Sequence, residues 1–242
     1  MKISSFHSNI EGVLVIDKEK GWTSHDVCAF VRGRFRIKKV GHAGTLDPLA
    51  TGVLVLLLGQ TTKRSQEFSS FDKDYYGTIR LGVKTDSHDA AGNVIGSRSW
   101  EAVTEAEIQK AFEKFKGVLE QTPPMVSALK HQGVRLYELA RRGETVERPK
   151  RTVVVRVFRV EEITLPKIRF FASVSKGTYL RTLVNDLGDF LGTFAILEDL
   201  RRVRSGPFTI QDAVTIEAIR KLDRASLGTV VRSSTLPTAT VA

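Results

Sequence analysis

Asp47 lies in the stretch of the chain whose residue types are best suited to chemistry. Residues 41–52 read Gly-His-Ala-Gly-Thr-Leu-Asp-Pro-Leu-Ala-Thr-Gly, and an apolar run follows at residues 53–58. Glycine adopts backbone angles that other residues avoid, and proline keeps the residue before it out of the helical region. We therefore expect Asp47 on a stiff, irregular loop, as a catalytic acid, base or nucleophile requires. The alternative is an Asp-Pro step that only caps a turn.

The elements that would position this loop lie on both sides of it. Residues 53–58 are continuously apolar, which predicts a strand buried on both faces. Residues 12–18 indicate a second short buried strand that ends in charge. Thr23 or Ser24 can cap a helix that follows, because apolar residues recur there at helical spacing.

Strands and helices both continue through the rest of the chain. Alternation and aromatic residues predict a strand near residues 71–82, and two more strands near 152–160 and 168–174. Thr104 and Glu107 form a capping box before an amphipathic helix. A further apolar stripe follows residue 180 at helical spacing.

The motif at residues 41–54 resembles the core motif of the bacterial TruB-type tRNA pseudouridine synthases. Such a long match is far more specific than a short glycine-rich pattern. Other segments resemble further motifs of that family in the same order: 18–27, 73–75, 121–130, 175–183 and 200–208. The resemblance implies an α+β pseudouridine synthase fold with a mixed, largely antiparallel central sheet flanked by helices and loops. It also implies isomerisation of uridine 55 in the T loop of tRNA.

The resemblance assigns roles to individual residues. Asp47 corresponds to the catalytic aspartate, which family mechanisms have attacking the base, attacking the sugar, or forming a glycal. Arg181 corresponds to the arginine that pairs with this aspartate, and His42 to a residue that enters the space left by the flipped base. The remaining pocket residues implied by the resemblance are Tyr75, Tyr179 and Leu200.

Basic residues predict a polyanionic partner. Lysine and arginine outnumber acids 37 to 27, which gives a net charge of +10. Five of the eight residues at 32–39 are basic, and residues 130–160 hold nine lysines or arginines against three glutamates. Such clusters suit a phosphate backbone, although solvated helix ends are an alternative. We expect RNA contacts from His42, Lys18, Lys20, Arg32, Arg34, Lys38, Lys39, Lys130, Arg141 and Arg142.

A chain of 242 residues fits one large domain, or one domain with an insertion. We expect a catalytic domain over residues 1–220 with a basic, RNA-contacting insertion at about 123–152. Residues 221–242 would form a short tail rich in Ser, Thr and Ala. We expect no full RNA-binding domain of the PUA type, which many relatives carry.

Composition narrows the functional class. Cys28 is the single cysteine, so no internal disulfide can form, and a cluster of cysteines around zinc is excluded. No signal peptide or membrane-spanning run is evident, so we expect a cytoplasmic monomer that binds the T-arm stem-loop of tRNA. Phosphate-loop, dinucleotide and metal templates are missing, and we expect neither cofactor nor metal; His88 with its neighbouring aspartates fits no ligand template.

Two other functional classes stay open. A tRNA-binding folding chaperone with incidental catalysis would share the basic clusters. A hydrolase that uses Asp47 as an acid or base would need a second carboxylate in an equally rigid motif, and none is evident.

Overall fold

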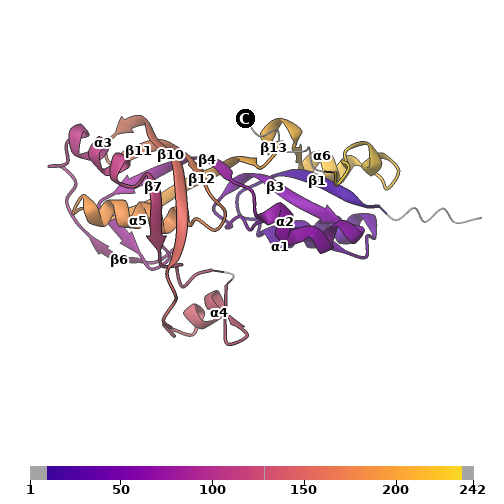
Figure 1. The fold of residues 1–242 in the computed structure, drawn as a ribbon, viewed down its shortest axis with the longest axis horizontal. Helices are drawn as coiled ribbons and strands as arrows, with labels where there is room; N and C mark the ends of the chain where they lie inside the picture. The colour runs from indigo at the N-terminus through magenta and orange to yellow at the C-terminus, as the bar shows by residue number, and fades with distance from the viewer. Residues whose placement is uncertain (1–9, 128, 236–242) are drawn as a thin grey trace, which may run out of the picture. The chain divides into compact units, whose positions relative to one another are not determined.

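The computed structural model describes residues 10–127 and 129–235, and these residues form two compact units (Figure 1). The first unit comprises the described residues up to Phe71 and those from Arg204 onward, and the second comprises Asp72–Val203. The expected division into residues 1–220 and 221–242 follows different boundaries, and it stays a prediction. At positions 130, 131, 137 and 141 the structure describes the backbone and not the side chain.

The first unit combines a sheet with short helices. Its strands are β1 (Gly12–Lys18), β2 (Val40–His42), β3 (Thr51–Leu58), β13 (Phe208–Thr209) and β14 (Val214–Thr215). Its α-helices are α1 (Ser24–Phe35), α2 (Ser65–Ser69) and α6 (Ile216–Lys221). Its 3-10 helices are η1 (Gly59–Arg64), η2 (Ile210–Asp212) and η3 (Ser226–Thr229).

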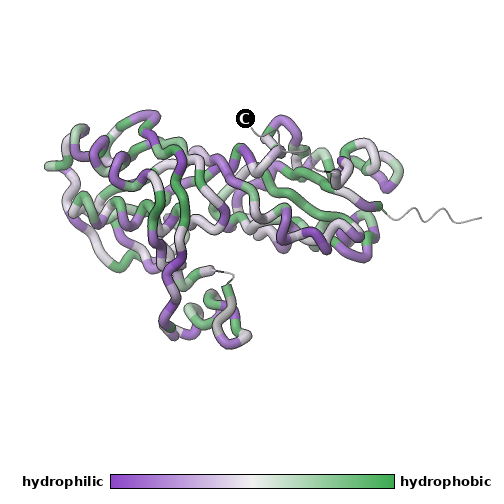
Figure 2. Tube along the Cα trace, viewed as in Figure 1, coloured by the Kyte–Doolittle hydropathy of each residue, from purple (hydrophilic) through white to green (hydrophobic). Residues whose placement is uncertain are grey.

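Strands β1 and β3 form the apolar centre of this unit. They pair antiparallel along their whole length, from Gly12 opposite Leu58 to Lys18 opposite Gly52. Every residue of β3 after the first is buried, so the expected strand with two buried faces is confirmed. Figure 2 shows the resulting apolar band along both strands. Phe68 of α2 packs into one of these faces.

Helix α1 begins where the sequence places a cap. Thr23 accepts a hydrogen bond from the Asp26 amide, and the Asp26 carboxylate accepts one from the Thr23 amide. This capping box satisfies amide groups that a helix start leaves unpaired. Val27, Val31 and the lone Cys28 are buried along the helix. Burial raises the pKa of the Cys28 thiol to about 12, so this cysteine is an inert packing residue.

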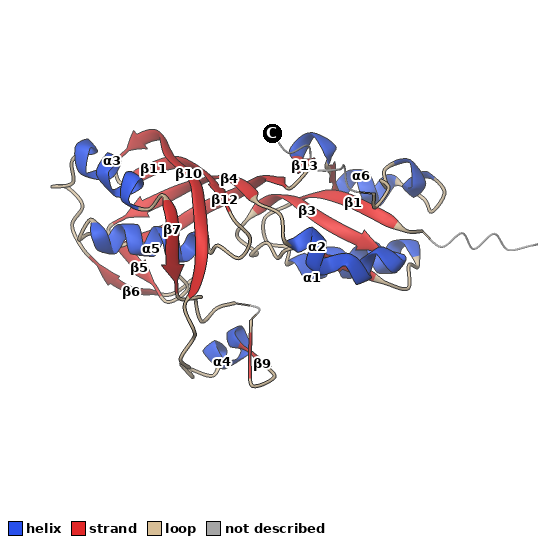
Figure 3. Ribbon diagram, viewed as in Figure 1, coloured by secondary structure: helices blue, strands red, loops and turns tan. Residues whose placement is uncertain are grey.

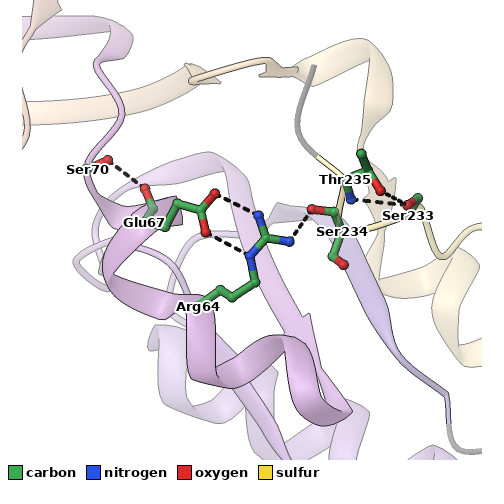
Figure 4. A network of polar contacts seen from close by, with 6 residues as sticks. All are labelled: Arg64, Glu67, Ser70, Ser233, Ser234 and Thr235. Carbon is green, nitrogen blue, oxygen red and sulfur yellow. Dashed lines mark hydrogen bonds and ion pairs between the residues drawn. The ribbon is translucent and has the colours of Figure 1, made fainter. Parts of the chain in front are cut away.

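Residues 226–235 return to the first unit's sheet. Val13 and Arg232 form an antiparallel bridge, with backbone hydrogen bonds in both directions. Arg64 holds Glu67 through two 2.7 Å hydrogen bonds and donates a third to the Ser234 carbonyl (Figure 4). These contacts fasten residues 232–234 to β1 and to the start of α2.

The second unit contains the longer strands. These are β4 (Lys73–Leu81), β5 (Val83–Thr85), β6 (Val94–Ser97), β7 (Gly117–Gln121), β8 (Lys130–His131), β9 (Val134–Arg135), β10 (Arg151–Thr164), β11 (Lys167–Val174) and β12 (Ala195–Ser205), whose last two residues belong to the first unit. Its helices are α3 (Glu105–Lys114), α4 (Leu136–Arg141) and α5 (Leu180–Phe190).

The main sheet of the second unit runs in the order β12-β4-β11-β10-β7, and the pairs β4–β11, β11–β10 and β10–β7 are antiparallel. Helix α3 packs against β10 (Figure 3). The rings of Phe112 and Phe158 stack there, with centroids 4.1 Å apart. Leu183, Val184 and Leu187 of α5 are buried, as the apolar stripe predicts. The expected α+β class with a largely antiparallel sheet is confirmed.

Residues 122–150 form an insertion between β7 and β10. It contains the β8–β9 hairpin and α4, which lies beyond the ends of the two flanking strands (Figure 1). Near its base, Arg148 donates a hydrogen bond to the Pro123 carbonyl at 3.1 Å. Among the helices of residues 10–127 and 129–235, none is long and apolar enough to cross a membrane.

Candidate active site and RNA-contacting residues

The residues on both sides of Asp47 are fixed by hydrogen bonds. The Leu46 amide donates to Ser24 Oγ at 2.8 Å, and Ser24 Oγ donates to the Leu46 carbonyl at 3.0 Å. The Gly21 amide donates to the Pro48 carbonyl at 2.8 Å. Ser24 is only 2% exposed, so water competes little for these bonds. Asp47 therefore sits between two anchored neighbours.

The loop is also fixed at its two roots. His42, the last residue of β2, pairs with Leu56 of β3, and the Ala43 amide donates to the Val55 carbonyl at 2.9 Å. Gly44 and Gly52 have φ angles of +101° and +98°, which side-chain-bearing residues rarely adopt. The expectation of an irregular loop around Asp47 is confirmed.

Lys18 has a different place from the one we expected. Its side chain is fully buried, and Nζ donates to the Glu19 carbonyl at 3.0 Å and the Trp22 carbonyl at 2.7 Å. These bonds hold the turn that carries Gly21, which in turn binds Pro48. Because phosphate contact requires an accessible ammonium, we revise the role of Lys18 from RNA contact to support of the Asp47 loop.

Arg34 also has structural partners. Its Nη2 donates to the carbonyls of Arg220 and Leu222 at 2.8 Å each, at the end of α6. Arg224 reciprocates by donating to the Phe35 carbonyl at the end of α1. Arg34 of α1 thus caps the end of α6, and Arg224, which follows α6, caps the end of α1, where unpaired carbonyls favour a cation. We name this exchange between Arg34 and Arg224 the arginine clasp.

The remaining basic candidates of the first unit are exposed, as Arg34 itself is. Solvent-accessible cations are available for phosphate contacts, whereas Arg34 is occupied by the arginine clasp. The exposed candidates are Lys20, Arg32, Lys38 and Lys39.

The second unit brings together the other pocket candidates. Tyr75 lies on β4 opposite Ala172 of β11, and it is 8% exposed. Leu200, on β12, is equally buried. Tyr179 occupies the N-cap position of α5, and Arg181 is the second residue of that helix. Tyr75, Tyr179, Arg181 and Leu200 therefore share this unit, and Asp47 and His42 share the first.

Arg181 is 2% exposed and makes contacts in several directions. Nη1 donates to the Ser87 carbonyl at 3.0 Å, and Nη2 donates to the Val126 carbonyl at 2.8 Å. Nε lies 3.7 Å from Oδ2 of Asp89. A buried guanidinium needs such partners, because an uncompensated charge away from water is costly. Arg181 is therefore a buried residue and not a member of an ordinary surface ion pair.

Asp89 is a site residue that sequence reasoning missed. Its Oδ1 accepts hydrogen bonds from Ser87 Oγ at 2.5 Å and from the Ala91 amide at 3.0 Å. These bonds leave Oδ2 directed toward Arg181. The sequence signal is a turn-forming segment, and a buried acid cannot be told there from an ordinary turn aspartate.

Tyr179 is held by two residues of the neighbouring strands. Gln121 Nε2 donates to the Tyr179 carbonyl at 3.2 Å, and the Tyr179 amide donates to Gln121 Oε1 at 3.0 Å. The Arg151 guanidinium lies over the Tyr179 ring, 4.4 Å from its centroid. Neither Gln121 nor Arg151 was expected at the site.

Burial lowers the pKa of three basic groups in the second unit. The pKa of Lys73, two residues before Tyr75, falls to about 8, chiefly because it is buried and secondly because Arg202 is close. Burial also lowers the pKa of Arg151 and of His88. The second unit therefore holds several desolvated basic groups.

The expected RNA contacts of the insertion are described in part. Arg142 follows α4 directly and is exposed. Lys130 belongs to β8 and Arg141 ends α4, but their side chains lie outside the described part of the chain.

Comparisons with known proteins place the chain in a family. The model of the TruB family pseudouridylate synthase N-terminal domain matches residues 32–180, and that of the tRNA pseudouridylate synthase B C-terminal domain matches residues 181–238. The chain is 47% identical to tRNA pseudouridine synthase B of Opitutus terrae, with 88% of each chain covered. It is 46% identical to the protein of that name from Burkholderia pseudomallei, over 87% of this chain and 69% of the relative.

Solved structures agree with these matches. A chain in the crystal structure of a Cbf5-Nop10-Gar1 complex superimposes with a TM-score of 0.67 at 31% identity. The match covers 85% of this chain and 52% of that one, so this chain spans about half the length of its structural neighbour. On the strength of the matched models and relatives, the chain belongs to the TruB family of pseudouridylate synthases.

Proposed function

We propose that this chain isomerises uridine 55 in the T loop of tRNA to pseudouridine, with Asp47 as the nucleophile. The observation that carries the proposal is the fixing of Leu46 and Pro48 on both sides of Asp47. A carboxylate mounted in this way loses little freedom when it attacks, and such preorganisation is what covalent catalysis requires. The relatives' name supplies the reaction.

The reaction breaks the bond between ribose and the base nitrogen, turns the base, and joins ribose to a base carbon. It is an isomerisation without net oxidation, so we propose that the side chains of this protein supply the chemistry without a cofactor. By its correspondence to the arginine that pairs with the family's aspartate, Arg181 would supply a positive charge for the Asp47 carboxylate. Tyr75 would pack on the flipped base, and Tyr179 and Leu200 would complete the pocket.

Uridine 55 lies inside a folded loop, so the base must leave its stack at a cost of about a few kcal/mol. His42 would fill the space that the base leaves. Phosphate contacts supply the offsetting binding free energy. For these contacts we propose the exposed Lys20, Arg32, Lys38, Lys39 and Arg142, together with Lys130 and Arg141 of the insertion.

We further propose that the chain acts as a monomer in the cytoplasm and recognises the T-arm stem-loop. Binding to a stem-loop would bring the loop nucleotide to the pocket while the stem's phosphates lie against basic side chains. A short T-arm stem-loop should then compete with full-length tRNA for the same site.

The test is incubation with a transcribed tRNA that lacks modifications, followed by nucleotide-resolved detection of pseudouridine. We expect one pseudouridine, at position 55. A transcript with cytidine at position 55 is the matched control and should gain none at any position. Tight binding without any pseudouridine would favour the folding chaperone instead, and modification at a different uridine would overturn the substrate assignment.

A further inference from the structure

The two ends of the insertion meet at a single pair of residues. Gln121 is the last residue of β7, Arg151 is the first residue of β10, and the insertion at residues 122–150 lies between them. The two residues are opposite each other in the antiparallel register of β7 and β10. A displacement of the base of the insertion therefore acts first on this pair.

Both residues also hold Tyr179. Gln121 is 2% exposed, and its side-chain amide binds the amide and the carbonyl of Tyr179. Arg151 covers the ring of the same tyrosine, 4.4 Å from its centroid. The backbone of Tyr179 is thus tied to one end of the insertion, and its ring is covered by the other.

A third contact joins the insertion to the start of α5. The Val126 carbonyl, five residues beyond Gln121, accepts the 2.8 Å hydrogen bond from Arg181. Two neighbouring residues of the proposed pocket therefore depend on where the base of the insertion lies.

The free-energy cost of burying the Arg151 guanidinium argues for a role of this residue beyond stability. Its Nε and Nη2 are buried and have no hydrogen-bond partner. Unsatisfied buried donors of a charged group are destabilising, and they are rare in folded proteins. A cation–aromatic contact returns part of this free energy, and an apolar side chain could cover the ring without the cost.

We propose that Gln121 and Arg151 are positioning residues, which hold Tyr179 in its productive place and make the pocket depend on the base of the insertion. The inference rests on the proposed function, because it takes Tyr179 as a pocket residue. RNA bound to the insertion would then fix Gln121, Arg151 and Tyr179 together. The pair acts through Tyr179 and not by contact with RNA.

The first test compares Gln121→Ala and Arg151→Met with wild type under single-turnover conditions at saturating enzyme. Small misplacements of reacting groups are costly, so we expect both variants to lower the rate about tenfold to a hundredfold. The Kd for tRNA should change by less than about twofold and keep its salt dependence, because no phosphate contact is lost. If the affinity for tRNA instead falls by about tenfold to a hundredfold while the rate is unchanged, the proposal is overturned and Arg151 is an RNA ligand.

Matched controls come from the same strands. Arg159→Met removes another arginine of β10, whose guanidinium lies 4.3 Å over the ring of Phe171. Glu120→Ala removes the neighbour of Gln121, which accepts a hydrogen bond from Thr152 at the surface. Both controls should keep the wild-type rate. If they slow the reaction as much as the test variants, the effect is general loosening of the sheet and the proposal fails.

A double-mutant cycle with Tyr179→Leu shows whether Arg151 affects the rate through Tyr179 or independently of it. We expect Arg151→Met to add less than about twofold once Tyr179 is leucine, because the target of its action is gone. Full additivity would contradict the proposal. If Gln121→Ala does not fold, Gln121→Glu replaces it, since the carboxylate still accepts from the Tyr179 amide but cannot donate to its carbonyl.

The cycle is interpretable only if wild type converts uridine 55. A wild type that binds tRNA without forming pseudouridine would overturn the proposed function. An active wild type with unimpaired Gln121 and Arg151 variants would overturn the present inference alone.

Discussion

The loop around Asp47 and the start of α5 are held in place by different kinds of contact. In the loop, the fixed groups are the backbone amide and carbonyl of Leu46 and the carbonyl of Pro48. At α5, the fixed groups are the side chain of Arg181, with Asp89 near it, and Tyr179 between Gln121 and Arg151. These contacts of the loop are therefore neutral hydrogen bonds, whereas the start of α5 also depends on the buried charges of Arg181 and Asp89.

This difference has energetic consequences. Loss of one neutral hydrogen bond that holds a loop costs about 1–3 kcal/mol when a buried partner is left unsatisfied. Loss of one partner of a buried charge costs about 3–5 kcal/mol, because the other charge stays uncompensated. Substitutions in the α5 network should therefore lower the single-turnover rate more than substitutions that loosen the Asp47 loop.

Among the residues that support Asp47, the largest effect on the rate should come from Arg181. Arg181→Met removes the cation that we propose for Asp47, and we expect the single-turnover rate to fall by about a hundredfold or more, or at least about 2.7 kcal/mol. Arg181→Lys keeps the charge but loses the planar guanidinium, so its rate should lie between those of Arg181→Met and wild type. The Kd for tRNA should change little in both. Rates within about twofold of wild type would place Arg181 outside the chemistry.

A smaller loss is expected for Asp89→Asn. The amide keeps the size of the side chain and can still accept from the Ala91 amide, but it removes the negative charge near Arg181. We expect the rate to fall by about tenfold at saturating enzyme, because Arg181 keeps its two carbonyl acceptors. Asp86→Asn, in the same turn but exposed, is the control. Equal effects of the two variants would argue against a specific role for Asp89.

Ser24→Ala tests the other side of the comparison. It removes the acceptor for the Leu46 amide and the donor to its carbonyl, so Asp47 gains freedom while its charge is unchanged. We expect a rate about threefold to tenfold below wild type, and recovery in Ser24→Thr if the pocket admits the extra methyl group. Ser70→Ala, at the exposed C-cap of α2, should have no effect on the rate. If Ser24→Ala lowered the rate more than Arg181→Met does, the expected order of the two regions would be reversed.

The smallest effect should be on stability alone. Arg34→Met opens one half of the arginine clasp, and we expect it to lower the free energy of unfolding by about 1 kcal/mol, or Tm by about 2–4 °C. Arg32→Met, on the same helix, should leave Tm unchanged but weaken tRNA binding, because Arg32 is exposed. Thermal unfolding and salt-dependent binding curves measure the two effects. A stable Arg34→Met protein with weakened RNA binding would restore Arg34 as an RNA contact.

The sequence predicts those features that depend on neighbouring residues. The capping boxes at Thr23 and Thr104, the buried strand β3 and the apolar stripe of α5 all follow from local patterns. The bond between Ser24 and Leu46 joins residues 22 positions apart, and that between Arg181 and Ser87 spans 94. Such pairings are set by how the strands come together, and local periodicity carries no signal for them.

The partner of each basic side chain was the second unpredictable quantity. Lys18 and Arg34 were both expected at the RNA, but Lys18 is buried and Arg34, although exposed, is engaged by other parts of the chain. The structure instead directs both to backbone carbonyls. Whether a lysine supports a turn or faces solvent depends on the packing around it, which a single sequence does not reveal.

The most direct test of the account is a side-by-side measurement of Asp47→Asn and Arg142→Glu. For each variant, the single-turnover rate of pseudouridine formation and the Kd for the same tRNA are measured. If Asp47 performs the chemistry and exposed cations hold the RNA, Asp47→Asn loses all turnover and keeps its Kd. Arg142→Glu then binds more weakly, with a flatter salt dependence, and reaches the wild-type rate at saturation. Measurable turnover by Asp47→Asn, with the amide intact after the assay, would contradict the account.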